Sequence, residues 1–107
     1  MVAELRMTVP VLRVLAALLD EPDTARYGVE LMEATGLASG SLYPILNRLR
    51  TAGWAEAEWE DVDPAAAGRP SRRYYRLTPD GVRRASKELA TLHRQTAAPS
   101  TKARPAW

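Results

Sequence analysis

The sequence predicts an α+β fold in which three helices and one β-hairpin share a single small core. Two observations predict it. Between Thr8 and Ala52, apolar residues recur at helical spacing in three successive segments. After Gly53 the period changes to strand-like alternation, and a basic second strand follows across a loop that contains glycine and proline. This order predicts a winged helix-turn-helix with a three-helix core, a two-stranded wing hairpin and a further C-terminal helix.

The bulk properties are those of a single small globular domain. The chain has 107 residues, which is enough for one modest core. It contains no cysteine, which excludes disulfides and thiolate metal sites. Its longest apolar run, residues 14–19, is far shorter than the roughly 18 residues that a membrane span needs. The N-terminus lacks a signal-peptide pattern, and we expect a cytoplasmic protein that makes no contact with a membrane.

The net charge of +2 conceals a strong asymmetry along the chain. Residues 1–67 hold five basic and eleven acidic side chains, whereas residues 68–107 hold ten basic and two acidic ones. A basic half of this kind suits a polyanion, and nucleic acid is the commonest polyanion in cells. The alternative is a solvated basic segment that has no partner.

Three helices are predicted in the first half of the chain. The first runs from about Thr8 to Leu19, with Thr8 as its cap and Pro10 in its first turn. The second covers about 27–35, and Gly36 ends it. The third begins between Ser39 and Ser41 and ends near Ala52. Only about three residues separate the second and third helices, which predicts a helix-turn-helix pair.

The second half predicts a hairpin followed by one helix. Residues 54–60 alternate between apolar and acidic, residues 61–70 form a loop, and residues 72–77 form the second strand. Thr78-Pro79-Asp80 then starts a helix that runs to about Gln95.

These elements imply a division of the chain into three parts. We expect residues 1–78 to form the DNA-binding domain and residues 79–96 a C-terminal dimerisation helix. Residues 97–107, which end at Trp107, have no periodicity and are expected to form a flexible tail.

The third helix carries the residues best suited to nucleic acid. Leu42, Ile45, Leu46 and Leu49 form its apolar stripe, and no acidic residue occurs between Ala38 and Gly53. Asparagine can read adenine and arginine can read guanine through paired hydrogen bonds. The alternative is an ordinary polar outer face. Pro44 fits a first turn if Ser41 caps the helix, and it predicts a slight distortion if the helix starts nearer Ser39.

The wing tip and the last helix suggest two further surfaces. Arg69, Arg72 and Arg73 lie between a glycine, a proline and a strand, which suits phosphate or minor-groove contact. The competing hypothesis is an ion pair with Glu56, Glu58 or Glu60 on the neighbouring strand. The last helix has a narrow apolar seam, which packs either on its own core or, as we favour, against a second subunit. The residues of this seam are Val82, Ala85, Leu89 and Leu92.

No constellation of residues points to an enzyme. The chain has one histidine, His93, beside the apolar seam, and it lacks a nucleophile motif, a phosphate-cradling loop and metal-ligand spacing. We therefore expect neither a cofactor nor a metal ion. Trp54 and Trp59 are interpreted as packing residues of the wing and core.

Three stretches together resemble the PadR family of bacterial transcriptional regulators, of the type with a short C-terminal helix. They are RYGVELMEATGL, SGSLYPILNRLRTAGW and GRPSRRYYRLTPDG, in the family's order and spacing across about residues 8–95. The resemblance implies a homodimer that represses transcription by binding an inverted repeat in double-stranded DNA. It also implies the DNA-contacting positions, which are Ser39, Ser41, Tyr43, Pro44 and Asn47 in the third helix, with Arg48 nearby, and Arg69, Arg72 and Arg73 in the wing. Gly40 joins them because the small residues at the start of the third helix let backbone amides meet a phosphate.

The resemblance further implies that the last helix drives dimerisation together with the first helix, where Leu12 and Leu15 are the expected partners. Members of the family often respond to small aromatic or drug-like molecules, so a small-molecule effector is a compatible hypothesis. The rival hypothesis from another class is a winged-helix protein–protein interaction module, an anti-repressor or assembly subunit, without specific DNA binding.

Overall fold

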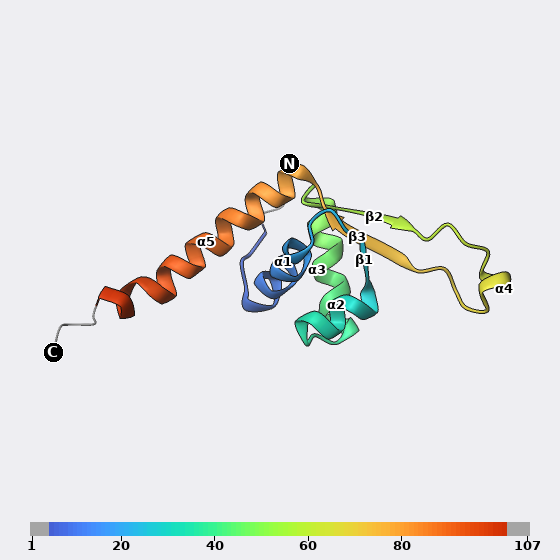
Figure 1. Cartoon of the computed structure of the whole chain (residues 1–107), viewed down its shortest axis with the longest axis horizontal. Helices are drawn as coiled ribbons and strands as arrows, with labels where there is room; N and C mark the ends of the chain where they lie inside the picture. Colours follow the sequence, from blue (N-terminus) through green and yellow to red (C-terminus); the bar gives the residue numbers. More distant parts are fainter. Residues whose placement is uncertain (1–4, 103–107) are drawn as a thin grey trace.

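A computed structural model describes residues 5–102 of the chain (Figure 1). It confirms the predicted α+β winged-helix architecture. The helices are α1 (Val9–Asp20), α2 (Gly28–Thr35), α3 (Ser39–Thr51), the short α4 (Pro64–Ala67) and α5 (Pro79–Lys102). The strands are β1 (Arg26–Tyr27), β2 (Ala55–Trp59) and β3 (Arg73–Leu77). None of the helices in this described range is both long and apolar enough to cross a membrane.

The core forms where α1, α2 and α3 meet one face of the sheet. The apolar stripe predicted for α3 is fully buried, and it packs against α1 residues such as Leu15 and Leu18. Trp54, Tyr75 and Leu77 close the core from the sheet side, as Trp54 was expected to do. Trp59 was also interpreted as a packing residue, but 64% of its surface is exposed because its part of the wing extends beyond the core.

Helix starts follow the predicted capping residues. The Thr8 hydroxyl accepts a hydrogen bond from the Val11 amide (3.3 Å), and Pro10 lies in the first turn of α1. At the start of α5 the Thr78 hydroxyl accepts from the Gly81 amide (2.9 Å). Both caps satisfy amides that have no partner within the helix.

The sheet contains one strand that the sequence did not predict. Its order is β1-β3-β2, and both pairings are antiparallel. β1 occupies two residues, of which Tyr27 was assigned to the second helix; it pairs with Tyr74 in β3. The predicted 61–70 loop also differs, because it contains α4, which Asp63 caps through its side chain. The strand places Tyr27 beside the wing.

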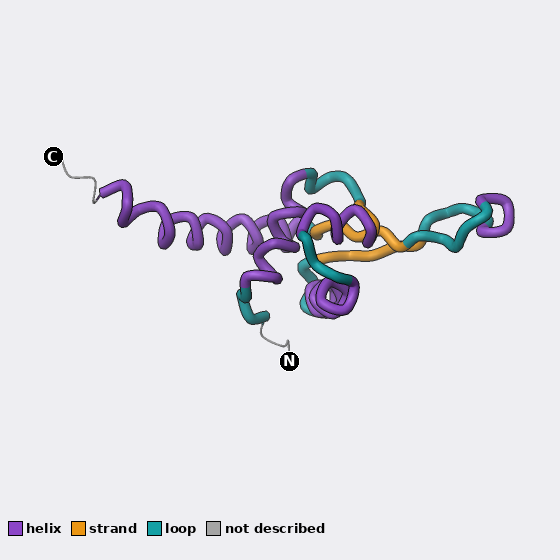
Figure 2. Tube along the Cα trace, turned by 90° about the horizontal axis from the view of Figure 1, so that it is seen from below, coloured by secondary structure: helices purple, strands orange, loops and turns teal. Residues whose placement is uncertain are grey.

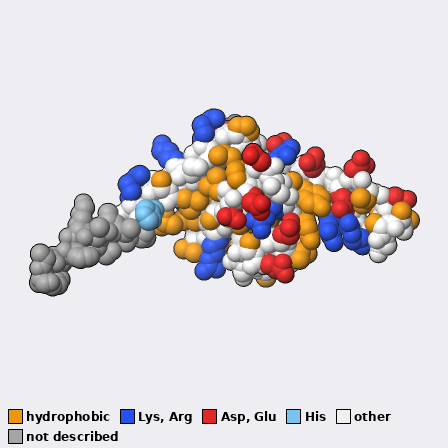
Figure 3. Space-filling model, in the orientation of Figure 1, with side chains coloured by type: hydrophobic (Ala, Val, Ile, Leu, Met, Phe, Trp, Pro, Cys, Tyr) orange, Lys and Arg blue, Asp and Glu red, His pale blue; other side chains and the backbone are white. Residues whose placement is uncertain are grey.

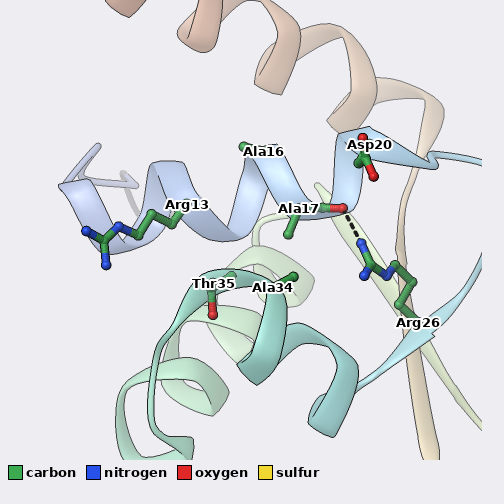
Figure 4. Close-up of a pocket in the computed structure, with 7 residues that line it drawn as sticks. All are labelled: Arg13, Ala16, Ala17, Asp20, Arg26, Ala34 and Thr35. Atoms are coloured by element: carbon green, nitrogen blue, oxygen red, sulfur yellow. Dashed lines mark hydrogen bonds between the residues drawn. The ribbon is translucent and has the colours of Figure 1, made fainter.

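Arg26 ties β1 to the end of α1. Its Nη1 atom donates to the carbonyl oxygen of Ala17 over 2.8 Å (Figure 4). Ala17 lies in the last turn of α1, where carbonyl groups have no intrahelical partner, and a cation is favourable at this end of a helix. The contact fixes the strand relative to the helical core, from which the wing projects (Figure 1).

The first turns of α5 pack in the core, and the rest of the helix extends away from the domain. Ala85 is fully buried in the same core as Leu15, because the first turns of α5 pack across α1. The predicted roles of Leu15 and Ala85 as dimer contacts are therefore wrong: the protomer itself covers both side chains. Val82 also packs against this core. Leu12 and Leu89 are half-buried, and 37% of Leu92 is exposed.

Beyond the core, α5 and the wing extend in opposite directions, as two perpendicular views agree (Figures 1 and 2). The helix continues past Gln95, where the sequence predicted its end, to Lys102. Alanine has the highest helix propensity, and Ala97 and Ala98 extend the helix without apolar periodicity. The rest of the predicted tail, 103–107 with Trp107, lies outside the described residues.

We expect Gly81→Ala to destabilise the fold by about 2 kcal/mol, the usual range for an overpacked core site. A Cβ atom at this position would overlap the carbonyl group of Trp54. That carbonyl cannot easily move, since it accepts hydrogen bonds from the Thr78 amide (2.9 Å) and hydroxyl (3.3 Å). Urea denaturation measures the free energy of unfolding. Gly40→Ala is the matched control: it lies in the first turn of α3 with open space around it, and it should stabilise by about 0.5 kcal/mol.

Candidate nucleic-acid interface

Two residues at the end of α2, Thr35 and Gly36, shape the turn between α2 and α3. Gly36 adopts a left-handed conformation (φ 76°) that ends α2. Beside it, the Thr35 hydroxyl donates to the Leu31 carbonyl (2.6 Å) and accepts from the Leu37 amide (3.2 Å). The three-residue connection confirms the predicted helix-turn-helix pair and fixes the direction of α3.

The outer face of α3 is polar and exposed along its whole length. Leu42, Ile45, Leu46 and Leu49 are turned into the core, so the opposite residues face solvent. The helix contains no carboxylate. The predicted DNA-contacting residues of this helix are all exposed and lie together on or beside this face: Ser39, Gly40, Ser41, Tyr43, Pro44, Asn47 and Arg48.

Pro44 lies inside α3 rather than in its first turn. The helix begins at Ser39 after the N-cap residue Ala38, so the alternative in which Ser41 caps it is wrong. Proline has no amide hydrogen, and the carbonyl of Gly40 therefore lacks its usual partner four residues on. Gly40 is exposed and has no atom within 4 Å of the place where a Cβ would stand. This first part of α3 is open to close approach by another molecule.

Two side chains on α3 are held by neighbours. Tyr43 is 40% exposed, and its hydroxyl end lies where a Cβ of Gly28 would be, so only glycine fits at the start of α2. The Asn47 Oδ1 atom accepts a hydrogen bond from Arg50 Nη2 over 2.9 Å. Asn47 is therefore oriented, and the geometry leaves its amide nitrogen as the group directed to a further partner.

The two faces of the wing differ in charge. Cross-strand pairs on one face are Ala55–Leu77, Ala57–Tyr75 and Trp59–Arg73; those on the other are Glu56–Arg76 and Glu58–Tyr74. The first face contains no acidic residue and continues the core surface toward α3. Figure 3 shows the same separation, with basic side chains on the lower side of the wing in this view and acidic ones on the upper side.

Stacking on aromatic rings holds two of the three wing arginines. The Arg72 guanidinium lies 4.4 Å from the centre of the Tyr27 ring, which in turn meets Tyr74 edge-on at 5.6 Å. Arg73 lies 5.4 Å from Trp59 and 5.9 Å from Tyr75. These contacts attract the cation to the ring faces and restrict its motion. Burial raises the pKa of Tyr75, so its hydroxyl stays neutral beside the arginine.

Arg69 has a different environment from the one predicted. Its Nη1 and Nη2 atoms bind the two carboxylate oxygens of Glu60 over 2.6 and 3.0 Å, and only 33% of its side chain is exposed. The competing hypothesis, an ion pair between a wing arginine and Glu56, Glu58 or Glu60, is therefore borne out for Arg69 and Glu60. Sequence reasoning missed the roles of Tyr27 and Trp59, because each depends on how the hairpin closes.

An open pocket of about 420 Å³ lies between α3 and the wing. Tyr43 lines it from α3, Gly28 from the start of α2, and Arg72 and Arg73 from the wing. The buried Nε atom of Arg73 has no hydrogen-bond partner in the described part of the chain. The pocket joins the exposed face of α3 to the acid-free face of the wing in one continuous surface, which can receive an anionic ligand.

Solved structures share this fold. A PadR-like transcription factor from Bacteroides fragilis has a TM-score of 0.68 and 20% identity, over 87% of this chain and 88% of that one. A PadR family transcriptional regulator from Eggerthella lenta has a TM-score of 0.66 and 22% identity, over 87% and 82%. The PcaV transcriptional regulator from Streptomyces coelicolor has a TM-score of 0.63 and 27% identity, over 92% and 68%.

Comparison with curated proteins finds no match. The sequence profile of the transcriptional regulator PadR-like family matches residues 14–87, which include the helix-turn-helix pair, the wing and the start of α5. That span is more than half of the chain, and it confirms the resemblance inferred from the three sequence stretches. The chain belongs to the PadR-like family of transcriptional regulators.

Proposed function

We propose that this protein is a sequence-specific regulator that binds double-stranded DNA as a homodimer and represses transcription from an inverted-repeat operator. The observation that carries the proposal is a continuous surface without acids, formed by the outer face of α3 and by the adjoining pocket that Tyr43, Arg72 and Arg73 line. DNA exposes phosphates on both sides of its major groove, so a surface without carboxylates enters the groove without like-charge repulsion.

The residues of this surface divide by chemistry. The small residues at the start of α3, Ser39 to Ser41, allow backbone amides to approach a phosphate. Asn47 and Arg48 carry groups that can read base edges in the major groove. Arg72 and Arg73 reach phosphates or the minor groove from the wing. The sequence hypothesis also counted Arg69 as a DNA contact. It is left out of these roles because Glu60 already binds its guanidinium.

Dimerisation is proposed to use the part of the apolar seam that the protomer leaves accessible. Leu92 is 37% exposed, and Leu12 and Leu89 are half-buried. A two-fold dimer would place two α3 helices on successive turns of DNA and would match an inverted repeat. We also propose that the protein acts in the cytoplasm and that a small molecule adjusts its DNA affinity. PcaV, one of the structures with this fold, has been solved with its natural ligand.

The test is fluorescence anisotropy with two duplexes of equal length and composition. One is the DNA directly upstream of the gene itself, and the other is a shuffled version of it. We expect the upstream duplex to bind at least ten times more tightly, the difference that one or two correct base contacts produce. Equal and weak binding to both would contradict the proposal and would favour the protein–protein interaction module.

We expect Asn47→Ala to weaken binding to the upstream duplex by about 10- to 100-fold and binding to the shuffled duplex hardly at all. The physical reason is that a hydrogen bond from the Asn47 amide nitrogen to a base edge is lost while the phosphate contacts remain. Thr51→Ala, one turn further along the same exposed face, is the control and should change neither affinity. An equal loss on both duplexes would remove Asn47 from the residues that read sequence.

A further inference from the structure

One carboxylate closes the outer end of the wing. Glu60 accepts hydrogen bonds from both terminal nitrogens of Arg69 (2.6 and 3.0 Å), from the Arg72 amide (3.2 Å) and from the Tyr74 hydroxyl (3.4 Å). Its own amide donates to the Arg72 carbonyl over 2.7 Å. Arg69 also donates to the Pro70 carbonyl (3.3 Å). Glu60 thus links the two strands at the point where the paired ladder ends.

The hydrogen bonds to the Glu60 carboxylate stabilise its charged form. The hydrogen bonds from Arg69 are the largest cause that lowers the pKa of Glu60 from its ordinary value of 4.5 to about 2. Desolvation opposes them, and the hydrogen bond from the Arg72 amide lowers the pKa further. The pKa of Arg69 is raised by the same hydrogen bonds. Both groups stay charged at neutral pH, and each neutralises the other.

From this geometry we infer that Glu60 is a positioning residue for DNA binding. Its carboxylate binds the Arg69 guanidinium and so keeps that cation from contacting phosphates. It also fixes the end of the wing, which restricts the direction in which the Arg72 side chain points. The inference rests on the proposed function. Three contacts support the fixing of Arg72. Glu60 holds the backbone of Arg72 on both its amide and its carbonyl, and Tyr27 then holds the guanidinium of that residue.

The two roles have opposite effects on binding. A free arginine at the end of the wing would add a phosphate contact to any duplex, so it would strengthen binding to random DNA. A fixed Arg72 contributes only where the DNA presents its backbone in the right place, so it favours the correct site. Glu60 therefore lowers the affinity for random DNA and raises the preference for the correct site.

The experiment compares the salt dependence of binding for Glu60→Gln and Glu58→Gln. Both variants remove one negative charge from the same stretch of the wing, but Glu58 is exposed and forms no ion pair within residues 5–102. We expect Glu60→Gln to steepen the slope of log affinity against log salt on the shuffled duplex by about 0.9 for each protomer. Its ratio of specific to random affinity should fall by about tenfold. Glu58→Gln should leave both quantities unchanged.

A double variant, Glu60→Gln with Arg69→Gln, keeps the net charge of the natural protein. We expect it to restore the original slope, because the released cation is gone, while the specificity ratio stays low. A slope shallower than that of the natural protein would show that Arg69 contacts phosphate directly and would overturn the inference. So would identical slopes for Glu60→Gln and Glu58→Gln.

A measurement on the protein without DNA separates this inference from the proposed function. The Arg72 amide should exchange its hydrogen faster in Glu60→Gln than in Glu58→Gln, as followed by nuclear magnetic resonance. Equal exchange would overturn the wing-fixing role whatever the protein binds. If exchange differs as expected but neither duplex binds at low salt, the proposed function fails, and the role of Glu60 in DNA binding fails with it.

Discussion

Leu92→Glu is expected to convert the proposed dimer into a monomer and to weaken binding to the proposed operator by about 100-fold or more. Leu92 is 37% exposed in the protomer, so a charge there leaves the protomer core intact. In a two-fold interface the same substitution buries two like charges, each of which carries a desolvation penalty of several kcal/mol. A monomer reaches one half-site only, and it loses the gain of about 10²- to 10⁴-fold that comes from linking two binding modules.

Sedimentation measures the oligomeric state, and anisotropy on the upstream duplex measures the affinity. Ala90→Glu is the matched control, since Ala90 is exposed on another face of α5 and the change in charge is identical. That variant should remain a dimer with unchanged affinity. Circular dichroism should report the same helix content for both. A Leu92→Glu protein that stays dimeric would place the interface elsewhere than on the seam of α5.

Local signals allowed much of the fold to be predicted from the sequence. The stripe of α3 follows from its 3.6-residue period, and the caps at Thr8 and Thr78 follow from side chains that can bind free amides. These features depend on residues a few positions apart. Helix ends depend on weaker preferences, and α5 accordingly runs further than its apolar seam.

The errors arise where an outcome depends on contacts distant in sequence. Periodicity shows that Ala85 is apolar and on the seam, but it does not tell whether α1 of the same protomer or a second copy covers it. β1 has two residues and exists only because β3 pairs with it. In the candidate site, the exposed face of α3 was predictable from the helix alone. An ion pair between a wing arginine and a neighbouring acid was one of the sequence hypotheses, but which two residues form it depends on the closure of the whole wing tip.

Binding to the upstream duplex is expected to weaken about 10⁴-fold when salt rises from 50 to 200 mM. Four arginines of each protomer are counted as phosphate contacts: Arg72 and Arg73 line the pocket beside the wing, and Arg48 and Arg50 are exposed on α3. If the eight of a dimer each neutralise one phosphate, the slope of log affinity against log salt is about −7. Arg69 is left out of this count because its charge is matched by Glu60.

Two substitutions test which arginines carry this dependence. Arg72→Gln should make the slope shallower by about 1.8 for the dimer, or 0.9 for each lost phosphate contact. Arg83→Gln is the control: Arg83 is an exposed arginine of α5, paired with Asp80 over 2.7 Å and outside the proposed surface. It should leave the slope unchanged. A slope near zero in the natural protein would mean that phosphates contribute little, and the wing and α3 would then have to bind a partner other than DNA.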